Sequence, residues 1–261
     1  MTRSIKAGLG RTLFTSRLHH LVLRDTALVV LFHRVHTGSD SDAIGIDVEL
    51  FERYCRFFGR FFRVVPLRDL VNRLARGAPA APMLAITFDD GYRDNFDNAA
   101  PILERFSLPA TFFVVSRWIG TDVVPWWDQR DGRRYPWMTW GEVRSLHARG
   151  FEIGAHTRTH VDLGAVDGSI AREEIVGGRL DLEDRLGVPV DSFAYPYGGR
   201  DKLTNSNRDV VRAAGYYCCC SGFGGLNRTG TDPFRLLRVP LSSWCKSPHQ
   251  FGFEVAAGLT L

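Results

Sequence analysis

The chain is 261 residues long, with 44% hydrophobic and 24% charged residues. These values are typical of a globular protein, and they exclude a disordered chain or a fibre. The formal net charge of +4 is not gathered into one long basic run, so we do not expect a nucleic-acid-binding protein.

Residues 1–26 are predicted to form a basic helical extension ahead of one large domain, residues 27–261. Ile5, Leu9 and Leu13 recur at near-helical spacing, with basic residues between them. Such a helix would either touch a membrane surface or pack on the flank of the domain, and we favour the packed helix.

Short apolar runs with the character of strands recur along the rest of the chain. The predicted strands are 28–33, 84–88, 111–115, 151–155, 192–195, 216–220 and 236–240. The predicted helices are 48–59, 67–76, 95–106, 139–149, 169–186 and 207–214. This alternation predicts parallel βαβ units, in a sheet that is covered on both faces or closed as a barrel.

Two features of the sequence indicate the cellular compartment. The longest early apolar run, 27–32, is too short for a signal-peptide core or a membrane span. The five cysteines are an odd number, and three of them are consecutive at 218–220, which does not suit a disulfide framework. We therefore expect reduced cysteines in a cytoplasmic protein, with peripheral contact at the inner membrane face as an option.

Two adjacent aspartates, Asp89 and Asp90, directly follow the strand predicted at 84–88. In parallel architectures the loops after the strands carry the chemistry. Neighbouring carboxylates repel each other unless a cation lies close by, so their position indicates a metal site. For an isolated Asp-Asp-Gly, a surface turn is the simpler interpretation.

Three other kinds of site are excluded. No G-x-x-x-x-G-K-[ST] loop is present, which excludes the magnesium-binding strand of a nucleotide hydrolase. Adjacent aspartates lack the spacing of an aspartyl-phosphate phosphatase. Residues 221–225 lack G-x-G-x-x-G, which excludes a dinucleotide fingerprint there.

Two histidines, His156 and His160, follow another predicted strand at a spacing of four residues. Both imidazoles can reach one ion, and imidazole with carboxylate suits Zn²⁺ or a similar divalent metal. Thr157 replaces the glutamate of the zinc-protease H-E-x-x-H, so the base must come from elsewhere. Asp89 and Asp90 would supply one metal ligand and one proton acceptor, which predicts a hydrolytic site.

Four motifs occur in a fixed order along the chain. They are ITFDDGY at 86–92, PATFFV at 109–114, GAHTRTH at 154–160 and FAYPYG at 193–198. In this order they resemble the polysaccharide deacetylase family, the NodB-homology carbohydrate esterases, over about residues 84–241. The resemblance implies a distorted (β/α)₇ barrel that binds one divalent metal ion, usually zinc, and hydrolyses N-acetyl or O-acetyl groups on sugars.

The resemblance also implies roles for individual residues. Asp90, His156 and His160 correspond to the metal ligands, and Asp89 corresponds to the general base. The backbone N–H of Tyr197 would help to stabilise the oxyanion that forms on the substrate, which is often the largest contribution to catalysis.

Two departures from the family pattern concern proton handling and leave metal binding intact. Ala194 stands where the family often has an arginine that orients the base, and residues 236–241 lack the usual histidine. Deacetylases of the poly-N-acetylglucosamine type resemble this chain in having a histidine before the Asp-Asp motif. His33 is therefore predicted to be the general acid, and Arg238 to pair with Asp89 in place of the missing arginine.

Aromatic residues crowd positions 118–140, and flat aromatic faces suit the apolar face of a sugar. We expect Trp126, Trp127 and Tyr197 to contact the substrate. The predicted reaction is metal-dependent removal of acetyl groups from N-acetylated sugars of a cell-envelope or exported polysaccharide, or of its lipid-linked precursor. Two alternatives stay open: hydrolysis of a formyl group or another small amide at the same site, and a catalytically silent carbohydrate-binding module.

Overall fold

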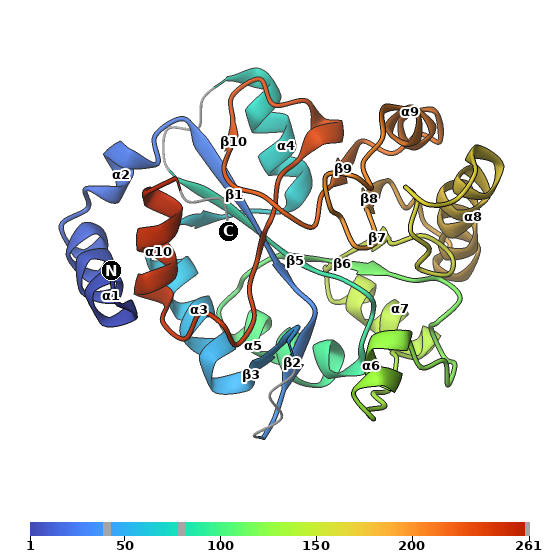
Figure 1. Cartoon of the computed structure of the whole chain (residues 1–261), viewed down its shortest axis with the longest axis horizontal. Coiled ribbons are helices and arrows are strands. Elements are labelled where there is room, and N and C mark those ends of the chain that lie inside the picture. Colours follow the sequence, from blue (N-terminus) through green and yellow to red (C-terminus); the bar gives the residue numbers. More distant parts are fainter. Residues whose placement is uncertain (39–42, 78–81, 259–261) are drawn as a thin grey trace.

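A curled sheet of parallel strands forms the centre of the fold (Figure 1). The computed structural model describes residues 1–38, 43–77 and 82–258. The main strands, in sheet order, are β1 (Thr26–Phe32), β5 (Met83–Phe88), β6 (Ala110–Val114), β7 (Glu152–Ala155), β8 (Ser192–Ala194) and β9 (Cys218–Cys220). Neighbouring strands in this order are all parallel, as predicted.

Short strands complete the sheet. β4 (Arg63–Val64) runs parallel to β5, and β10 (Asn227–Arg228) runs antiparallel to β1. The segment 236–240 brings the two ends of the sheet together, because Leu236 bridges to Cys220 of β9 and β11 (Val239–Pro240) pairs with β1. The predicted strand 236–240 is thus confined to its last two residues, since Leu237 N–H donates to Asn227 Oδ1 instead of a strand carbonyl.

Helices surround the sheet and connect its strands (Figure 1). The helices between the main strands include α3 (Val48–Phe61), α4 (Leu67–Arg76), α5 (Ala100–Arg105), α7 (Trp140–Ala148), α8 (Gly168–Leu186) and α9 (Asn205–Ala213). Their starts follow local capping chemistry: Asp47 caps α3, Thr139 and Glu142 form a capping box on α7, and Asp167 caps α8. Five of these six coincide closely with helices predicted from the sequence, and α5 covers only the second half of the predicted helix 95–106.

One predicted helix, 95–106, is divided in the structure. Its first part is a π-helical turn, η1 (Asn95–Ala99), and α5 follows directly. Pro101 has no N–H to donate to the carbonyl four residues earlier, so a regular helix cannot run through this point unbroken.

Several short elements were not predicted. They are β2 (Arg34–His36), β3 (Gly45–Asp47), α6 (Trp126–Arg130), the 3₁₀ turn η2 (Pro233–Arg235) and α10 (Pro248–Ala256). The helix α6 lies inside the aromatic-rich stretch 118–140, ahead of the helix predicted at 139–149.

The sheet is apolar on both faces. Leu28, Val30 and Phe32 belong to the larger hydrophobic cluster, whereas Ala27 and Val29 belong to a second cluster that includes side chains of α4. This alternation explains why the strand sequences read as continuous apolar runs. All five cysteines are buried and free of disulfides, and Cys218 and Cys220 lie on the same face of β9.

The N-terminal segment forms α1 (Arg3–Thr15) and α2 (His19–Val22). The helix α1 packs against α10, with the Phe14 side chain fully buried. A side chain at Gly10 would overlap the backbone carbonyl of His249, so the two helices lie in close contact. Within the described ranges no helix is long and apolar enough to cross a membrane. The division of the chain at residue 26 and a cytoplasmic location stay predictions.

Candidate metal centre and active site

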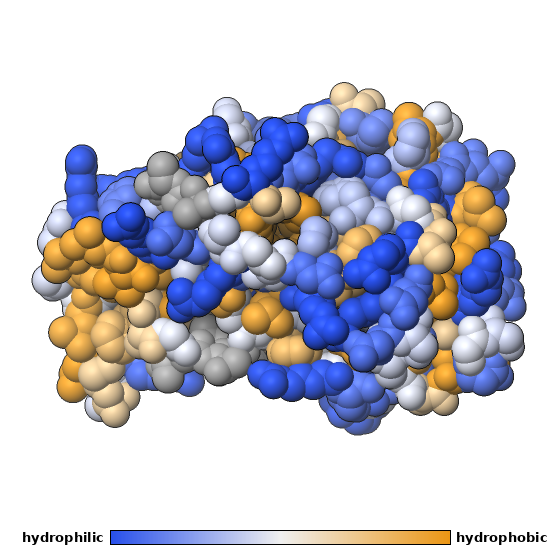
Figure 2. All heavy atoms as spheres, turned by 90° about the horizontal axis from the view of Figure 1, so that it is seen from above, coloured by the Kyte–Doolittle hydropathy of each residue, from blue (hydrophilic) through white to orange (hydrophobic). Residues whose placement is uncertain are grey.

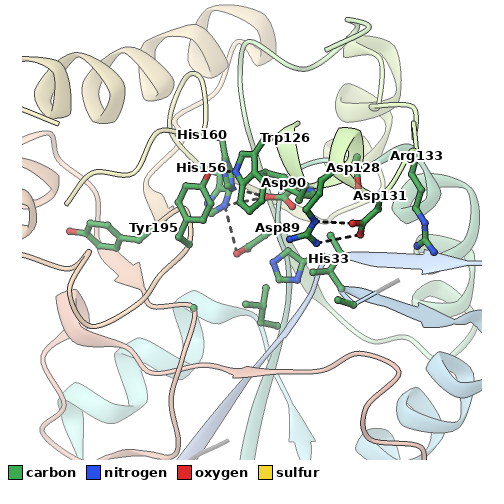
Figure 3. A pocket seen from close by; sticks show the side chains of 17 residues that line it. His33, Asp89, Asp90, Trp126, Asp128, Asp131, Arg133, His156, His160 and Tyr195 are labelled. Carbon is green, nitrogen blue, oxygen red and sulfur yellow. Dashed lines mark hydrogen bonds and ion pairs between the residues drawn. The ribbon is translucent and has the colours of Figure 1, made fainter. Parts of the chain in front are cut away.

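The predicted site residues meet in a pocket at the carboxyl ends of the strands (Figure 3). His33 follows β1, Asp89 and Asp90 follow β5, and His156 follows β7. All four side chains line this pocket, together with His160. Residues up to 127 positions apart in the sequence thus share one site, because parallel strands end at the same rim.

Asp90, His156 and His160 form a candidate metal centre. Asp90 Oδ1 lies 3.4 Å from His156 Nε2 and 3.2 Å from His160 Nε2. One ligand atom from each residue lies within 4.8 Å of the other two. Asp90 Oδ1 is buried and has no hydrogen-bond partner among the described residues, so a cation would satisfy it. A two-histidine, one-carboxylate set is a donor set that suits Zn²⁺.

The backbone fixes the orientation of the His156 ring. Its Nδ1 lies 2.8 Å from the carbonyl oxygen of Ala194, at the end of β8. The ring therefore donates from Nδ1 and presents Nε2 toward Asp90 as an acceptor, which is the tautomer that a metal ligand requires. Ala194 thus contributes through its backbone, although its side chain lacks the arginine expected from the family pattern.

The electrostatics of the three groups favour metal ligation. Burial disfavours the charged form of Asp90, but His156 and His160 outweigh burial and hold the pKa of Asp90 well below its ordinary value. Burial lowers the pKa of His160. For His156 burial is opposed by Asp89 and Asp90, which raise its pKa. Asp90 is thus held as a carboxylate, the form in which it can bind a cation.

Asp89 is held by Arg238. The guanidinium donates two hydrogen bonds to the carboxylate, from Nη1 to Oδ1 at 2.7 Å and from Nη2 to Oδ2 at 2.6 Å. Arg238 is fully buried and also donates to Thr87 Oγ1 and to the Ser221 carbonyl. Such a bidentate pair fixes the plane of the carboxylate. The pairing inferred from the missing arginine is therefore present, while its catalytic role stays a proposal.

The loop after β7, which carries His156 and His160, has unusual backbone angles and is held in place by hydrogen bonds to α8. Thr157 and His160 have φ angles of 63° and 60°, as unusual for non-glycine residues as the 73° of Asp90. Glu174 of α8 accepts hydrogen bonds from Arg158 N–H, Thr159 N–H and Thr159 Oγ1, at 2.8–2.9 Å. This buried carboxylate was not predicted, because it belongs to a helix that the sequence separates from the motif.

His33 lies beside the two aspartates in Figure 3. Its side chain lines the same pocket as Asp90, His156 and His160, so the imidazole shares the pocket with the candidate metal centre. Asn95 of η1 donates from Nδ2 to the His33 carbonyl at 2.9 Å and thereby fixes the end of β1. Asn95 is fully buried, and its position in the DDGYRDN stretch is the signal by which it could have been found.

Aromatic side chains form one wall of the pocket. Trp126 is 57% exposed, and its Nε1 donates to Tyr197 Oη at 3.2 Å. Trp127 lies against the His160 ring and donates to Tyr92 Oη. Tyr197 is 45% exposed and lies 4.8 Å from the His160 ring, so it is not a core aromatic.

The remaining tryptophans lie outside the pocket lining. Trp118 and Trp137 are buried against each other beneath this wall, and Trp140 packs at the edge of the larger core cluster. Of the crowded aromatic stretch, only the segment at α6 therefore presents tryptophan faces to the pocket.

A model of the polysaccharide deacetylase family matches residues 76–219, which is more than half of the chain. The chain belongs to the polysaccharide deacetylase family. This membership confirms the family indicated by the four motifs.

Relatives by sequence are distant and mostly longer. A putative polysaccharide deacetylase of Bacillus subtilis (strain 168), YxkH, is 20% identical over 188 residues, covering 71% of this chain and 60% of the relative. The poly-β-1,6-N-acetyl-D-glucosamine N-deacetylase of Escherichia coli (strain K12) is 35% identical over 93 residues, covering 33% of this chain and 14% of the relative. The chain thus spans less than two thirds of the length of these relatives.

Solved structures share the fold. The Streptococcus pyogenes deacetylase PplD has a TM-score of 0.72 at 17% identity, covering 87% of this chain and 96% of that one. IcaB from Ammonifex degensii also has a TM-score of 0.72, at 24% identity, covering 89% and 97%. The expectation of a distorted (β/α)₇ barrel of the NodB-homology type is confirmed by these similarities.

Proposed function

We propose that this chain is a metal-dependent amidohydrolase that removes acetyl groups from N-acetylated sugars of a cell-envelope or exported polysaccharide, or of its lipid-linked precursor. One observation carries the proposal. A candidate metal triad, Asp90 with His156 and His160, lies beside a second carboxylate, Asp89, that Arg238 holds in a fixed plane. A purely structural cluster would not need a second buried carboxylate facing the pocket.

Asp90, His156 and His160 would hold one divalent ion, and Zn²⁺ is the ion we expect. When bound, such an ion polarises the amide carbonyl and lowers the pKa of water. The buried, unsatisfied Asp90 Oδ1 and the Nε2 atoms of the two histidines supply the ligand atoms.

Asp89 would accept the proton of the attacking water. The bidentate bond from Arg238 fixes the plane of the carboxylate, so that little reorganisation is needed when the proton arrives. Arg238 thereby fills the place left by the alanine at position 194.

His33 would donate the proton that the leaving amine needs. His33 follows β1, whereas Asp89 follows β5. The backbone N–H of Tyr197 would donate to the oxyanion that forms on the carbonyl, and its left-handed φ of 60° fixes the direction of that N–H. Acid and base thus come from different strands.

Trp126 and Trp127 would hold the sugar ring. Tyr197, whose ring lies next to those of Trp127 and His160, would extend this aromatic wall. The related E. coli protein is named for poly-β-1,6-N-acetyl-D-glucosamine, and a Sinorhizobium fredii relative for chitooligosaccharide. Both names denote N-acetylated amino-sugar polymers, which supports an amide rather than an ester as the bond that is hydrolysed.

Product analysis tests the proposal. The chain is incubated with β-1,6- and β-1,4-linked N-acetylglucosamine oligomers and with their N-formyl counterparts, before and after chelation. We expect acetate release that chelator abolishes and zinc restores. Formate release without acetate release would assign the small-amide alternative. Zinc-independent oligosaccharide binding with no product of either kind would assign the silent binding module.

A further inference from the structure

Large hydrophobic side chains are exposed on the outer faces of α1 and α2. They are Ile5, Leu9, Leu18, Leu21 and Val22, which we call the N-terminal patch, and each is 46–71% exposed. With Met1, they make up six of the eleven exposed large hydrophobic residues among the described residues. Figure 2 shows hydrophobic atoms gathered at the end of the molecule where Figure 1 places α1 and α2.

The patch is rigidly presented. Phe14 and Gly10 face α10 and are buried, and Lys6 reaches across to Glu254 of α10 at 3.1 Å. The opposite face, with Ile5 and Leu9 one helical turn apart, is exposed and is not covered by any of the described residues. The helix therefore does not need to unfold to expose its apolar stripe.

The surroundings of the patch are basic. The first 24 residues contain four arginines and one lysine and no acidic residue. Arg11 and Arg17 are exposed and make no salt bridge with any described residue. The pKa of His249 on α10 is lowered by burial and further by Arg11 and Arg60, which agrees with a positive potential at this end.

We propose that the N-terminal patch docks on an anionic lipid bilayer. A helix with apolar side chains interspersed with arginines can lie parallel to the membrane surface. Its apolar side chains then reach the boundary between the lipid headgroups and the acyl chains. A second copy of the chain fits less well, because a two-fold contact would bring the same arginines face to face, and the neighbouring acidic residues, Asp25 and Glu254, already contact Arg24 and Lys6. The observations therefore favour lipid over self-association.

Docking in this way leaves the pocket accessible. The patch adjoins the amino end of β1, which starts four residues after α2, whereas His33 at the other end of β1 lines the pocket. The seven residues of β1 separate the two by roughly 20 Å. A surface-bound molecule would thus still admit a sugar chain from the side of the aqueous phase.

Vesicle co-sedimentation of the full chain tests the proposal. Neutral phosphatidylcholine vesicles are compared with vesicles that contain phosphatidylglycerol, at low and high salt. We expect binding to the anionic vesicles that high salt weakens. The variants Ile5→Ser/Leu9→Ser/Leu21→Ser and Arg11→Gln/Arg17→Gln should each bind about tenfold or more weakly, because both the apolar area and the arginines contribute.

Matched controls separate the patch from general surface effects. Ile170→Ser/Leu180→Ser and Arg144→Gln/Arg172→Gln change exposed residues of other helices and should bind as the parent does. Circular dichroism and thermal midpoints should be unchanged in all four variants. Equal binding to both vesicle types, full binding by the triple serine variant, or concentration-dependent self-association that this variant abolishes without any vesicle binding would each overturn the proposal.

Discussion

The buried pair between Arg238 and Asp89 gives the sharpest test of how the site handles protons. Replacing Arg238 with Met keeps most of the side-chain volume but removes all donors. Asp89 then stays buried without its two hydrogen bonds, and it is free to rotate away from the plane in which it faces the pocket.

The expected loss of stability in Arg238→Met follows from the burial of both Arg238 and Asp89. Removing one partner of a buried ion pair costs about 3–5 kcal/mol. For a chain of this size that corresponds to a fall in the thermal midpoint of roughly 10 °C. General-base catalysis contributes about 10²–10⁴-fold to rate, so we expect kcat to fall by at least about 100-fold. Zinc affinity should be nearly unchanged, because Arg238 does not contact the triad.

A double-mutant cycle with Asp89→Asn isolates the coupling. Thermal midpoint, zinc stoichiometry and acetate release are measured for both single variants and the double variant. If Arg238 acts only through Asp89, the double variant should be no slower than Asp89→Asn alone. As a control, Arg149→Met removes a bidentate pair with Glu104 at the surface and should cost less than about 1 kcal/mol, with no loss of rate.

The proposed role of Arg238 in orienting Asp89 is wrong if Arg238→Met lowers the thermal midpoint yet keeps kcat within threefold of the parent. Arg238 would then serve stability alone, and some other group would orient the base. Fully additive losses of rate in the double variant would likewise show that Arg238 and Asp89 act independently.

Three further substitutions test other parts of the site. His33→Ala should retain one bound zinc per chain while turnover collapses by about 100-fold, and unchanged turnover would remove His33 as the acid. Glu174→Ala frees the strained loop that carries the histidines and should weaken zinc binding about 10–100-fold in a chelator competition, whereas an unchanged affinity would show that the loop holds its shape unaided. Trp126→Ala should raise KM several-fold with little change in kcat or thermal midpoint, because its ring is exposed; Leu180→Ala, an equally exposed change on α8, serves as its control.

The residues after the strand ends could be predicted from the sequence. Asp90, His156 and His160 each follow an apolar run whose length and flanks mark a strand, and parallel strands end at one rim. The pairing of Arg238 with Asp89 could be inferred only indirectly, because Ala194 stands where the family often has an arginine. Its two hydrogen bonds depend on how the segment 236–240 closes the sheet, and this closure has no local sequence signal.

The supporting residues could not be predicted in the same way. Glu174 lies in a helix where an acidic residue is ordinarily solvated, and only the packing of α8 on the histidine loop buries it. The helix spacing of α1 was visible, but its partner α10 was not, because a nine-residue helix near Pro248 has too few turns to show a clear period. Strands β2 and β3 have three residues each and carry no period at all.

Zinc titration of the metal-free chain tests the central claim most directly. Acetate release from an N-acetylglucosamine oligomer is followed as zinc is added, for the parent and for His160→Ala. We expect the rate to rise in proportion to the added zinc, to level off at one equivalent per chain, and to stay near background in the variant at the same zinc concentrations. Full acetate release by the metal-free parent, or one tightly bound zinc with no acetate release from any N-acetylated oligomer, would contradict that claim.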